Sequence, residues 1–137
     1  MNILHVIIGL NVGGAENSLK RLIDSHKNNT NYQHSVISLM TIGKVGEQLQ
    51  ESGIDVCSLG LKSLLSLPIT FFRLIRFIRK AKPDIVHTWM YHADLLGGLA
   101  AWAMRTKVIW SIRNTDISIN SGTAVTTKYI MYACAFL

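Results

Sequence analysis

The sequence has few cysteines, few charges and no long hydrophobic run. Its two cysteines, Cys57 and Cys134, are far apart and form no C-x-x-C pair, which excludes a zinc knuckle and a redox motif. We expect both as buried thiols in a reducing cytosol. No run reaches about 18 apolar residues, so no transmembrane helix is predicted. The N-terminus also lacks the basic segment of a signal peptide.

Several catalytic motifs are missing as well. The absence of G-x-x-x-x-G-K-[ST] excludes a P-loop nucleotidase, and the absence of G-x-S-x-G excludes an α/β-hydrolase elbow. Without G-x-G-x-x-G, a dinucleotide-dependent oxidoreductase is disfavoured. Without D-x-D, a metal-bridged nucleotide-sugar site of that design has no ligands, and we predict no metal site.

The charged residues are predominantly basic. Lysine and arginine outnumber aspartate and glutamate 14 to 8, a net charge of +6. This balance suits phosphorylated ligands, nucleic acid or an anionic membrane surface. Nucleic acid is the weakest of these partners, because the basic residues are not interleaved with aromatics in a known module, and we predict none.

Short apolar runs alternate with longer helical patterns along the 137 residues. Strands are predicted at Asn2–Ile8, His34–Met40, Asp55–Leu59, Asp84–Thr88 and Val108–Ile112. Helices are predicted at Gly14–Lys27, Val45–Ser52, Leu67–Ala81, Tyr91–Arg105 and Thr123–Phe136. Continuous Val, Ile and Leu runs are typical of a parallel sheet covered on both faces. The pattern therefore predicts one α/β domain, a doubly wound, mainly parallel, Rossmann-like sheet.

The end of the chain lacks the usual helix stop signals. The last predicted helix has no terminal glycine, proline or basic turn, and it leaves Phe136 and Leu137 at the chain end. We therefore expect residues 1–137 to be a domain truncated near its C-terminus.

The first strand leads into a glycine-rich turn, Gly9-Leu-Asn-Val-Gly13-Gly14-Ala-Glu16, which opens a helix. Glycines allow close approach of the main chain, and the free N–H groups of the first helical turn attract anions. Gly13 and Gly14 are therefore candidates for phosphate binding. The alternative interpretation is plain turn chemistry.

A second candidate segment runs from Lys82 to Asp94 and holds two histidines. His87 falls at a predicted strand end, and His92 falls where the next helix begins. Their spacing of five does not place both imidazoles on one helical face, which argues against a metal pair. His92 could donate to a substrate oxygen or act as a general acid or base. Packing at the strand end is the alternative for His87.

The next strand end delivers Arg113 and Asp116 to the same rim of the sheet. Arg113 could hold a phosphate or carboxylate through a two-pronged hydrogen bond. A surface ion pair between Arg113 and Asp116 is the alternative interpretation.

The predicted helix Leu67–Ala81 has two distinct sides. Its apolar spacing predicts that Leu67, Phe71, Leu74 and Ile78 pack on the sheet. Basic residues with apolar neighbours, typical of attachment to anionic lipid, follow another side: Arg73, Arg76, Arg79 and Lys80 beside Ile69 and Phe72. A merely solvated helix face is the alternative.

The ordered set of motifs resembles a known family. Gly13-Gly14-Ala-Glu16, Lys82-Pro-Asp-Ile-Val-His87, the His92-Ala stretch and the strand Val108–Ile112 are similar to the N-terminal half of GT-B-fold glycosyltransferases of family 4. The similarity extends from Met1 to about Thr127.

The resemblance implies a two-domain retaining enzyme with its active site between two Rossmann-like halves. Gly13 and Gly14 would reach the donor diphosphate, His92 would be catalytic, and His87, Arg113 and Asp116 would contact the acceptor. It implies no cofactor beyond the nucleotide-sugar co-substrate. A cytoplasmic enzyme at the inner face of the plasma membrane, making polysaccharide or glycolipid, would fit it.

The family's donor-binding half is missing from this sequence. The paired-glutamate pattern E-x7-E does not occur, since the only glutamates are Glu16, Glu47 and Glu51. We therefore expect residues 1–137 alone to be inactive in sugar transfer. The alternative function is a non-enzymatic α/β module that binds a phosphorylated small molecule or regulates a partner.

Overall fold

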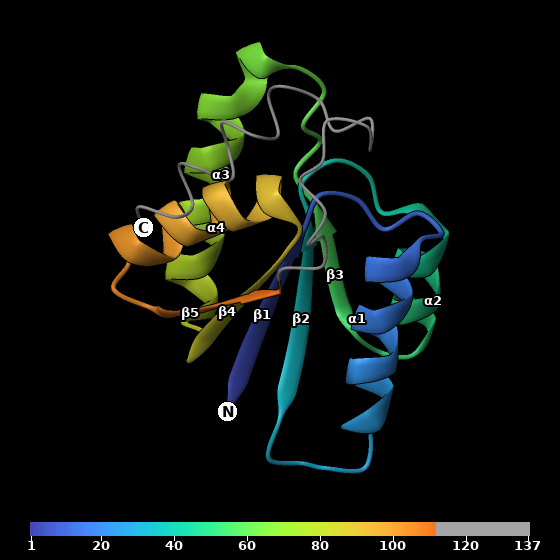
Figure 1. Cartoon of the computed structure of the whole chain (residues 1–137). Coiled ribbons are helices and arrows are strands. Elements are labelled where there is room, and N and C mark those ends of the chain that lie inside the picture. The colour runs from blue at the N-terminus through green and yellow to red at the C-terminus, as the bar shows by residue number, and fades with distance from the viewer. Residues whose placement is uncertain (112–137) are drawn as a thin grey trace, which may run out of the picture.

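The computed structural model describes residues 1–111, which form one parallel sheet flanked by helices (Figure 1). The strand order is β3-β2-β1-β4-β5, and all four neighbouring pairs are parallel. The strands are β1 (Asn2–Ile7), β2 (Gln33–Ser38), β3 (Asp55–Ser58), β4 (Ile85–Trp89) and β5 (Lys107–Ser111). The helices are α1 (Gly14–Ser25), α2 (Gly43–Glu51), α3 (Leu67–Ala81) and α4 (Tyr91–Ala103), with a short 3₁₀ turn, η1, at Leu64–Ser66. The predicted doubly wound α/β fold is confirmed.

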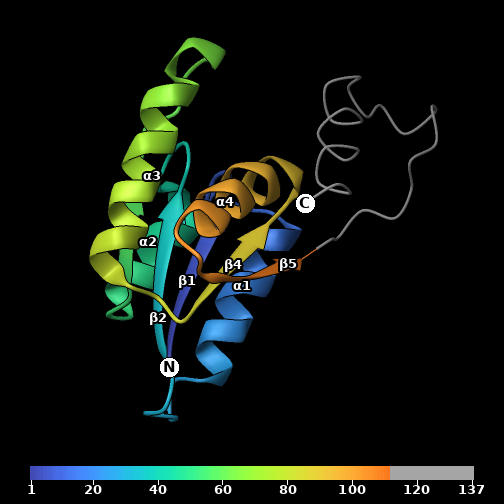
Figure 2. The same cartoon turned by 90° about the vertical axis from the view of Figure 1, so that its left-hand side faces the viewer.

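Helices cover both faces of the sheet, as Figures 1 and 2 show. On one face, α1 and α2 bury Leu19, Ile23 and Leu49 against β-strand residues that include Val36. On the other face, α3 and α4 form a second core that includes Leu74 and several alanines. Because both faces of the sheet are buried, the strand sequences contain continuous apolar runs and do not strictly alternate with polar residues.

Most element boundaries agree with the sequence patterns to within two residues. The bounds of α3 match the prediction, whereas α2 begins two residues earlier than expected, at Gly43. One prediction is wrong: Cys57 is exposed on β3 rather than buried. Arg113, Asp116 and the predicted helix Thr123–Phe136 lie outside the described residues.

The strand order contains the point at which the winding direction reverses. The chain moves outward from β1 through β2 to β3 and then returns to place β4 on the other side of β1. Ligands of open α/β sheets bind outside the carboxyl ends of the strands at such a point. The loops after β1 and β4 are therefore where a site is expected.

Candidate functional site

The loop after β1 leads into α1 through an extended glycine. Gly13 is the N-cap residue of α1, with φ −166° and ψ 178°, and no side chain caps the helix. The N-terminal end of α1 therefore faces the carboxyl edge of the sheet with its partial positive charge. This geometry places both predicted phosphate-binding glycines, Gly13 and Gly14, where an anion could approach the first helical turn.

The two glycines differ in what surrounds them. A Cβ at Gly13 would collide with the carboxylate of Glu16, which folds back over this residue. A Cβ at Gly14 would meet no atom within 4 Å, so the space in front of Gly14 is open. An anion at this helix end would thus meet open space at Gly14 and an acidic neighbour at Gly13.

A third glycine supports this edge, and the sequence patterns did not single it out. Gly43 begins α2 with φ +61°, and a Cβ there would lie 2.6 Å from backbone atoms of Leu10. The amide of Val45 also donates to the carbonyl oxygen of Leu10 at 2.9 Å. Only glycine fits this contact, which holds the start of α2 against the loop after β1. The signal in the sequence was a glycine two residues before the predicted helix Val45–Ser52.

The connection from β4 to α4 carries His92 and a strained residue. Met90 has φ 73° and ψ 149°, a backbone conformation that residues other than glycine rarely adopt. His92 follows as the second residue of α4 and is exposed. The structure therefore places His92 at the carboxyl edge, as predicted from the sequence. Strain of this kind is often found at functional sites.

His87 lies deeper in the sheet than the sequence pattern suggested. It is the third of the five residues of β4 and is half-buried, so it is not at the end of the strand. Its Nε2 atom lies 2.7 Å from the hydroxyl of Ser111 on β5. The contact of His87 with an acceptor stays a prediction.

Asp94 is a buried carboxyl group in the first turn of α4. It is 1% exposed, and its Oδ1 atom has no hydrogen-bond partner among the described residues. Burial raises the pKa of Asp94 to about 6, against the opposing effect of a hydrogen bond with Thr88. Burial also raises the pKa of the neighbouring Tyr91, with a smaller contribution from Asp94. Asp94 is too buried to reach a substrate, so its effect on the site is structural.

The basic side of α3 is exposed, as predicted. Ile69 is 58% exposed and Phe72 is 70% exposed, and they continue the exposed surface of Leu65 before the helix. The four predicted basic side chains are also exposed: Arg73, Arg76, Arg79 and Lys80. Arg73 additionally donates to the carbonyl oxygen of Leu59 at 3.2 Å. Against the sheet, Leu74 and Ile78 are buried together with Thr70, which the apolar spacing did not indicate.

The histidines form a cluster that the sequence patterns did not reveal. His5 and His26, which carry no motif, both lie within hydrogen-bond distance of His34 and in ring contact with it. In residues 1–111, no group of three or more His, Cys, Asp or Glu side chains is arranged to hold a metal ion. Likewise, no helix in this part of the chain is long and apolar enough to cross a bilayer.

Comparisons with known proteins agree with this geometry. The model of Glycosyltransferase Family 4 matches residues 12–133 of the chain. No sequence match is found among curated proteins.

Solved structures share the fold at low sequence identity. MurG of Acinetobacter baumannii is similar with a TM-score of 0.69 and 14% identity over 96% of this chain and 38% of its own. Alr3699/HepE of Anabaena, crystallised in complex with UDP, is similar with a TM-score of 0.70 and 17% identity over 98% of this chain and 35% of its own. UDP-GlcNAc 2-epimerase of Neisseria meningitidis, bound to UDP-GlcNAc, has a TM-score of 0.57 and 16% identity over 98% of this chain and 39% of its own. The chain thus spans about two fifths or less of these proteins.

Proposed function

Because this chain belongs to glycosyltransferase family 4, we propose that it is the acceptor-side domain of a retaining, metal-independent enzyme. The enzyme moves a hexose from a nucleotide-sugar to a polysaccharide or lipid-linked acceptor, in the cytoplasm at the inner face of the plasma membrane. The observation that carries the proposal is the meeting of two loops at the reversal point of the sheet. One loop leads to the N-terminal end of α1, and the other presents His92.

In this proposal the end of α1 stabilises the donor. Transfer leaves the diphosphate of the donor with extra negative charge, and helix N–H groups that already point at it lower the barrier. Gly14 fits this role because the space in front of it is open. The UDP in the HepE crystals and the UDP-GlcNAc in the Neisseria epimerase support a nucleotide-sugar as the donor.

His92 is the proposed catalytic contact to the transferred sugar. An exposed imidazole on the first turn of α4 can donate a hydrogen bond to a sugar oxygen and act as a general acid or base. Most of the rate would then come from holding donor and acceptor in a reactive position. Arg113 and Asp116, together with His87, are the proposed acceptor contacts.

The acceptor would be presented at a membrane by α3. The N-terminal end of α3 points toward the carboxyl edge and projects past the other helices (Figures 1 and 2). Apolar Leu65, Ile69 and Phe72 lie near this end, and the basic residues follow along the same helix. Apolar side chains near the N-terminal end of the helix can insert into a bilayer, and the basic side chains that follow can bind anionic lipid headgroups.

Vesicle flotation tests the membrane contact. Wild-type protein should float with vesicles that contain phosphatidylserine, and the triple variant R73E/R76E/R79E should stay behind because it reverses three exposed charges. A matched control, K20E/R21E/K27E, reverses three charges on α1 and just after its end and should float as wild type does. Equal flotation of both triple variants, or no flotation of the wild type, contradicts the contact.

The donor site is tested by following backbone amide resonances during titration with UDP. We expect UDP to shift the amides of Gly13 through Glu16, and Gly14→Ala to weaken this effect by adding a methyl group to the open space. Gly9→Ala is the matched control, because a Cβ at Gly9 also meets nothing within 4 Å. Shifts by inorganic phosphate equal to those by UDP would favour the non-enzymatic binding module. No shift with either probe would refute the donor contact.

A further inference from the structure

Four of the five histidines gather on the side of the sheet that α1 covers. His5 is on β1, His34 is on β2 and His87 is on β4, and His26 ends α1 as its C-cap residue. The parallel register sets His5 directly beside His87 and sets His34 beside Ile3, two residues before His5 on the same strand. The folded sheet thus assembles residues that are far apart in the sequence.

Three of these imidazoles form a hydrogen-bonded chain that ends on a buried indole. Nδ1 of His26 lies 3.1 Å from Nε2 of His34, and Nδ1 of His34 lies 3.0 Å from Nε2 of His5. Nε1 of Trp89 donates to Nδ1 of His5 at 3.2 Å. Each neighbouring ring pair is nearly parallel, with interplanar angles of 17° and 18° and centroids 5.2 Å apart.

The indole sets the direction of the whole chain. An indole nitrogen can only donate, so Nδ1 of His5 must be the acceptor and the proton of neutral His5 must be on Nε2. His5 then donates to His34, and His34 donates from its Nε2 to Nδ1 of His26. All three rings are therefore held as the Nε2–H tautomer.

This arrangement has no place for an additional proton. Each ring already accepts a hydrogen bond at Nδ1, so a proton added to any of the three would face a donor of its neighbour. Moving the proton along the chain only moves the conflict, and at His5 it would face the indole of Trp89. Protonation therefore breaks at least one contact of the chain wherever the proton resides.

The surroundings of the chain also disfavour positive charge. Burial lowers the pKa of His5, with further lowering by His87, His34 and His26. Burial also lowers the pKa of His34, followed by the effect of His26. The other charged or titratable groups that face the chain are Tyr32, stacked on His26, and Asp24 and Lys27, which line the adjoining pocket. Within residues 1–111 no carboxylate is hydrogen-bonded to these three imidazoles.

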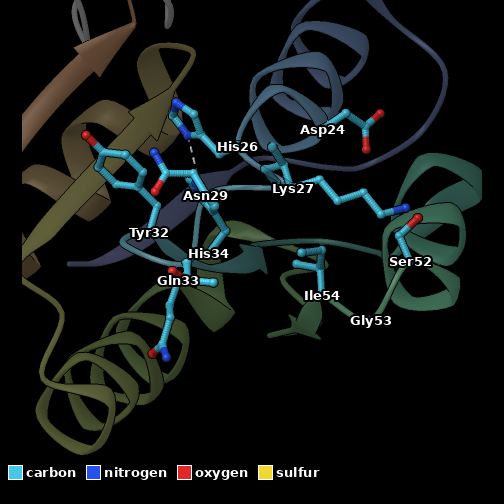
Figure 3. A pocket seen from close by; sticks show the side chains of 12 residues that line it. Asp24, His26, Lys27, Asn29, Tyr32, Gln33, His34, Ser52, Gly53 and Ile54 are labelled. Carbon is cyan, nitrogen blue, oxygen red and sulfur yellow. Dashed lines mark hydrogen bonds between the residues drawn. The ribbon is translucent and has the colours of Figure 1, made fainter.

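The outer end of the chain is reached from a pocket at the amino edge of the sheet. The pocket has a volume of about 450 Å³ and is lined by His26 and His34, among other mostly polar groups (Figure 3). Figure 3 shows the contact between His26 and His34 as a dashed line beside Asn29. Protons from solvent therefore reach the chain at His26 and His34, whereas its inner end at His5 is fully buried.

The inner end adjoins the candidate site. Trp89 is 2% exposed and is the last residue of β4, directly before the strained Met90 and the start of α4. The chain of imidazoles thus connects a solvent pocket at one edge of the sheet to the strand end that presents α4 at the other edge.

We propose that His26, His34 and His5 form a proton-sensitive latch on Trp89. With all three rings neutral the latch is closed and the indole is fixed, and protonation of the chain opens it and loosens the end of β4. The latch stands independently of the proposed transferase function, because it depends only on the hydrogen-bond geometry of the fold.

His34→Gln is the decisive variant. A glutamine side chain offers one acceptor and one donor, so it can bridge His5 and His26, but it cannot take up a proton near neutral pH. We expect the unfolding equilibrium constant of wild type relative to His34→Gln to rise by up to about tenfold per pH unit below about pH 6.5. His92→Gln removes an exposed histidine outside the latch and should not reproduce this change.

A local readout separates the latch from general acid sensitivity. The indole N–H of Trp89 should exchange faster with solvent as the pH falls from about 7.5 to about 5.5, relative to the exposed indole of Trp102 in the same sample. In His34→Gln this relative acceleration should be reduced. If that variant does not fold, His26→Gln at the outer end gives the same comparison. A constant stability ratio, or the same relative exchange of Trp89 in wild type and variant, would overturn the proposal.

Discussion

Replacing Asp94 with asparagine should stabilise this protein at neutral pH. The carboxyl group is 1% exposed, and the hydroxyl of Thr88 beside it already donates to the carbonyl oxygen of Ile109 at 3.3 Å. The single hydroxyl proton of Thr88 is divided between Ile109 and Asp94, so its hydrogen bond only partly opposes the effect of burial on the pKa of Asp94. A protonated Asp94 can donate to Thr88 instead, and so can the amide of asparagine. The variant therefore imitates the neutral acid, which is the form that this site prefers.

The magnitude follows from the raised pKa of Asp94. The pKa is about 6 in the folded chain against 3.8 for an ordinary aspartate, and each unit is worth about 1.4 kcal/mol, so ionisation at neutral pH costs about 3 kcal/mol. We expect Asp94→Asn to gain up to about 3 kcal/mol near pH 7.

The pH dependence provides the stricter check. Because the folded pKa is raised, the folded state binds more protons than the unfolded state between pH 3.8 and about 6, and wild-type stability falls as the pH rises through this window. The gap between variant and wild type should widen across it and stay level above it. Protonation of the histidines affects both proteins and cancels in the difference.

Urea denaturation at several pH values measures the gap. Asp24→Asn, which neutralises an exposed carboxylate on α1, controls for the loss of one negative charge. A variant that is less stable than wild type at pH 7, or a gap that does not change from about pH 4.5 to about pH 7, would refute the reasoning.

Three further outcomes can be measured on the same chain. Gly43→Ala should lose at least ~2 kcal/mol in urea denaturation, because φ is +61° and the new Cβ would lie 2.6 Å from the Leu10 backbone, whereas Gly9→Ala should change little. Met90→Gly should gain ~1 kcal/mol, since relief of ~1–3 kcal/mol of backbone strain exceeds the added flexibility of the unfolded chain; a net loss would show that the strain is small. Residues 1–137 alone should transfer no sugar from a radiolabelled nucleotide-sugar, and detectable transfer without a partner would contradict the inactivity that we propose.

The sequence patterns were most reliable where the physical signal is local. The bounds of α3 follow from a 3.6-residue apolar period and a proline in its first turn, and both act within the helix itself. The strands were recognisable because residues buried on both faces must be apolar. The carboxyl-edge position of Gly13, Gly14 and His92 follows from the same alternation, since in a doubly wound sheet every strand-to-helix loop reaches that edge.

Backbone dihedral angles and exact strand ends were harder to predict from the sequence. The sequence around Met90 does not predict its positive φ, because methionine has no preference for that backbone conformation. The predicted strand end at His87 was also inaccurate, since β4 begins and ends one residue later than its apolar run indicated.

The sequence by itself determined the class of fold, the order of its elements and the edge at which a ligand would bind. These follow from local periodicity and from turn chemistry. Only the tertiary structure decided that His5, His26 and His34 form a single chain, because strand register and the end of α1 bring together residues up to 29 positions apart. It also decided that Asp94 is buried beside the hydroxyl of Thr88, since burial depends on what packs above a residue and not on its neighbours in sequence.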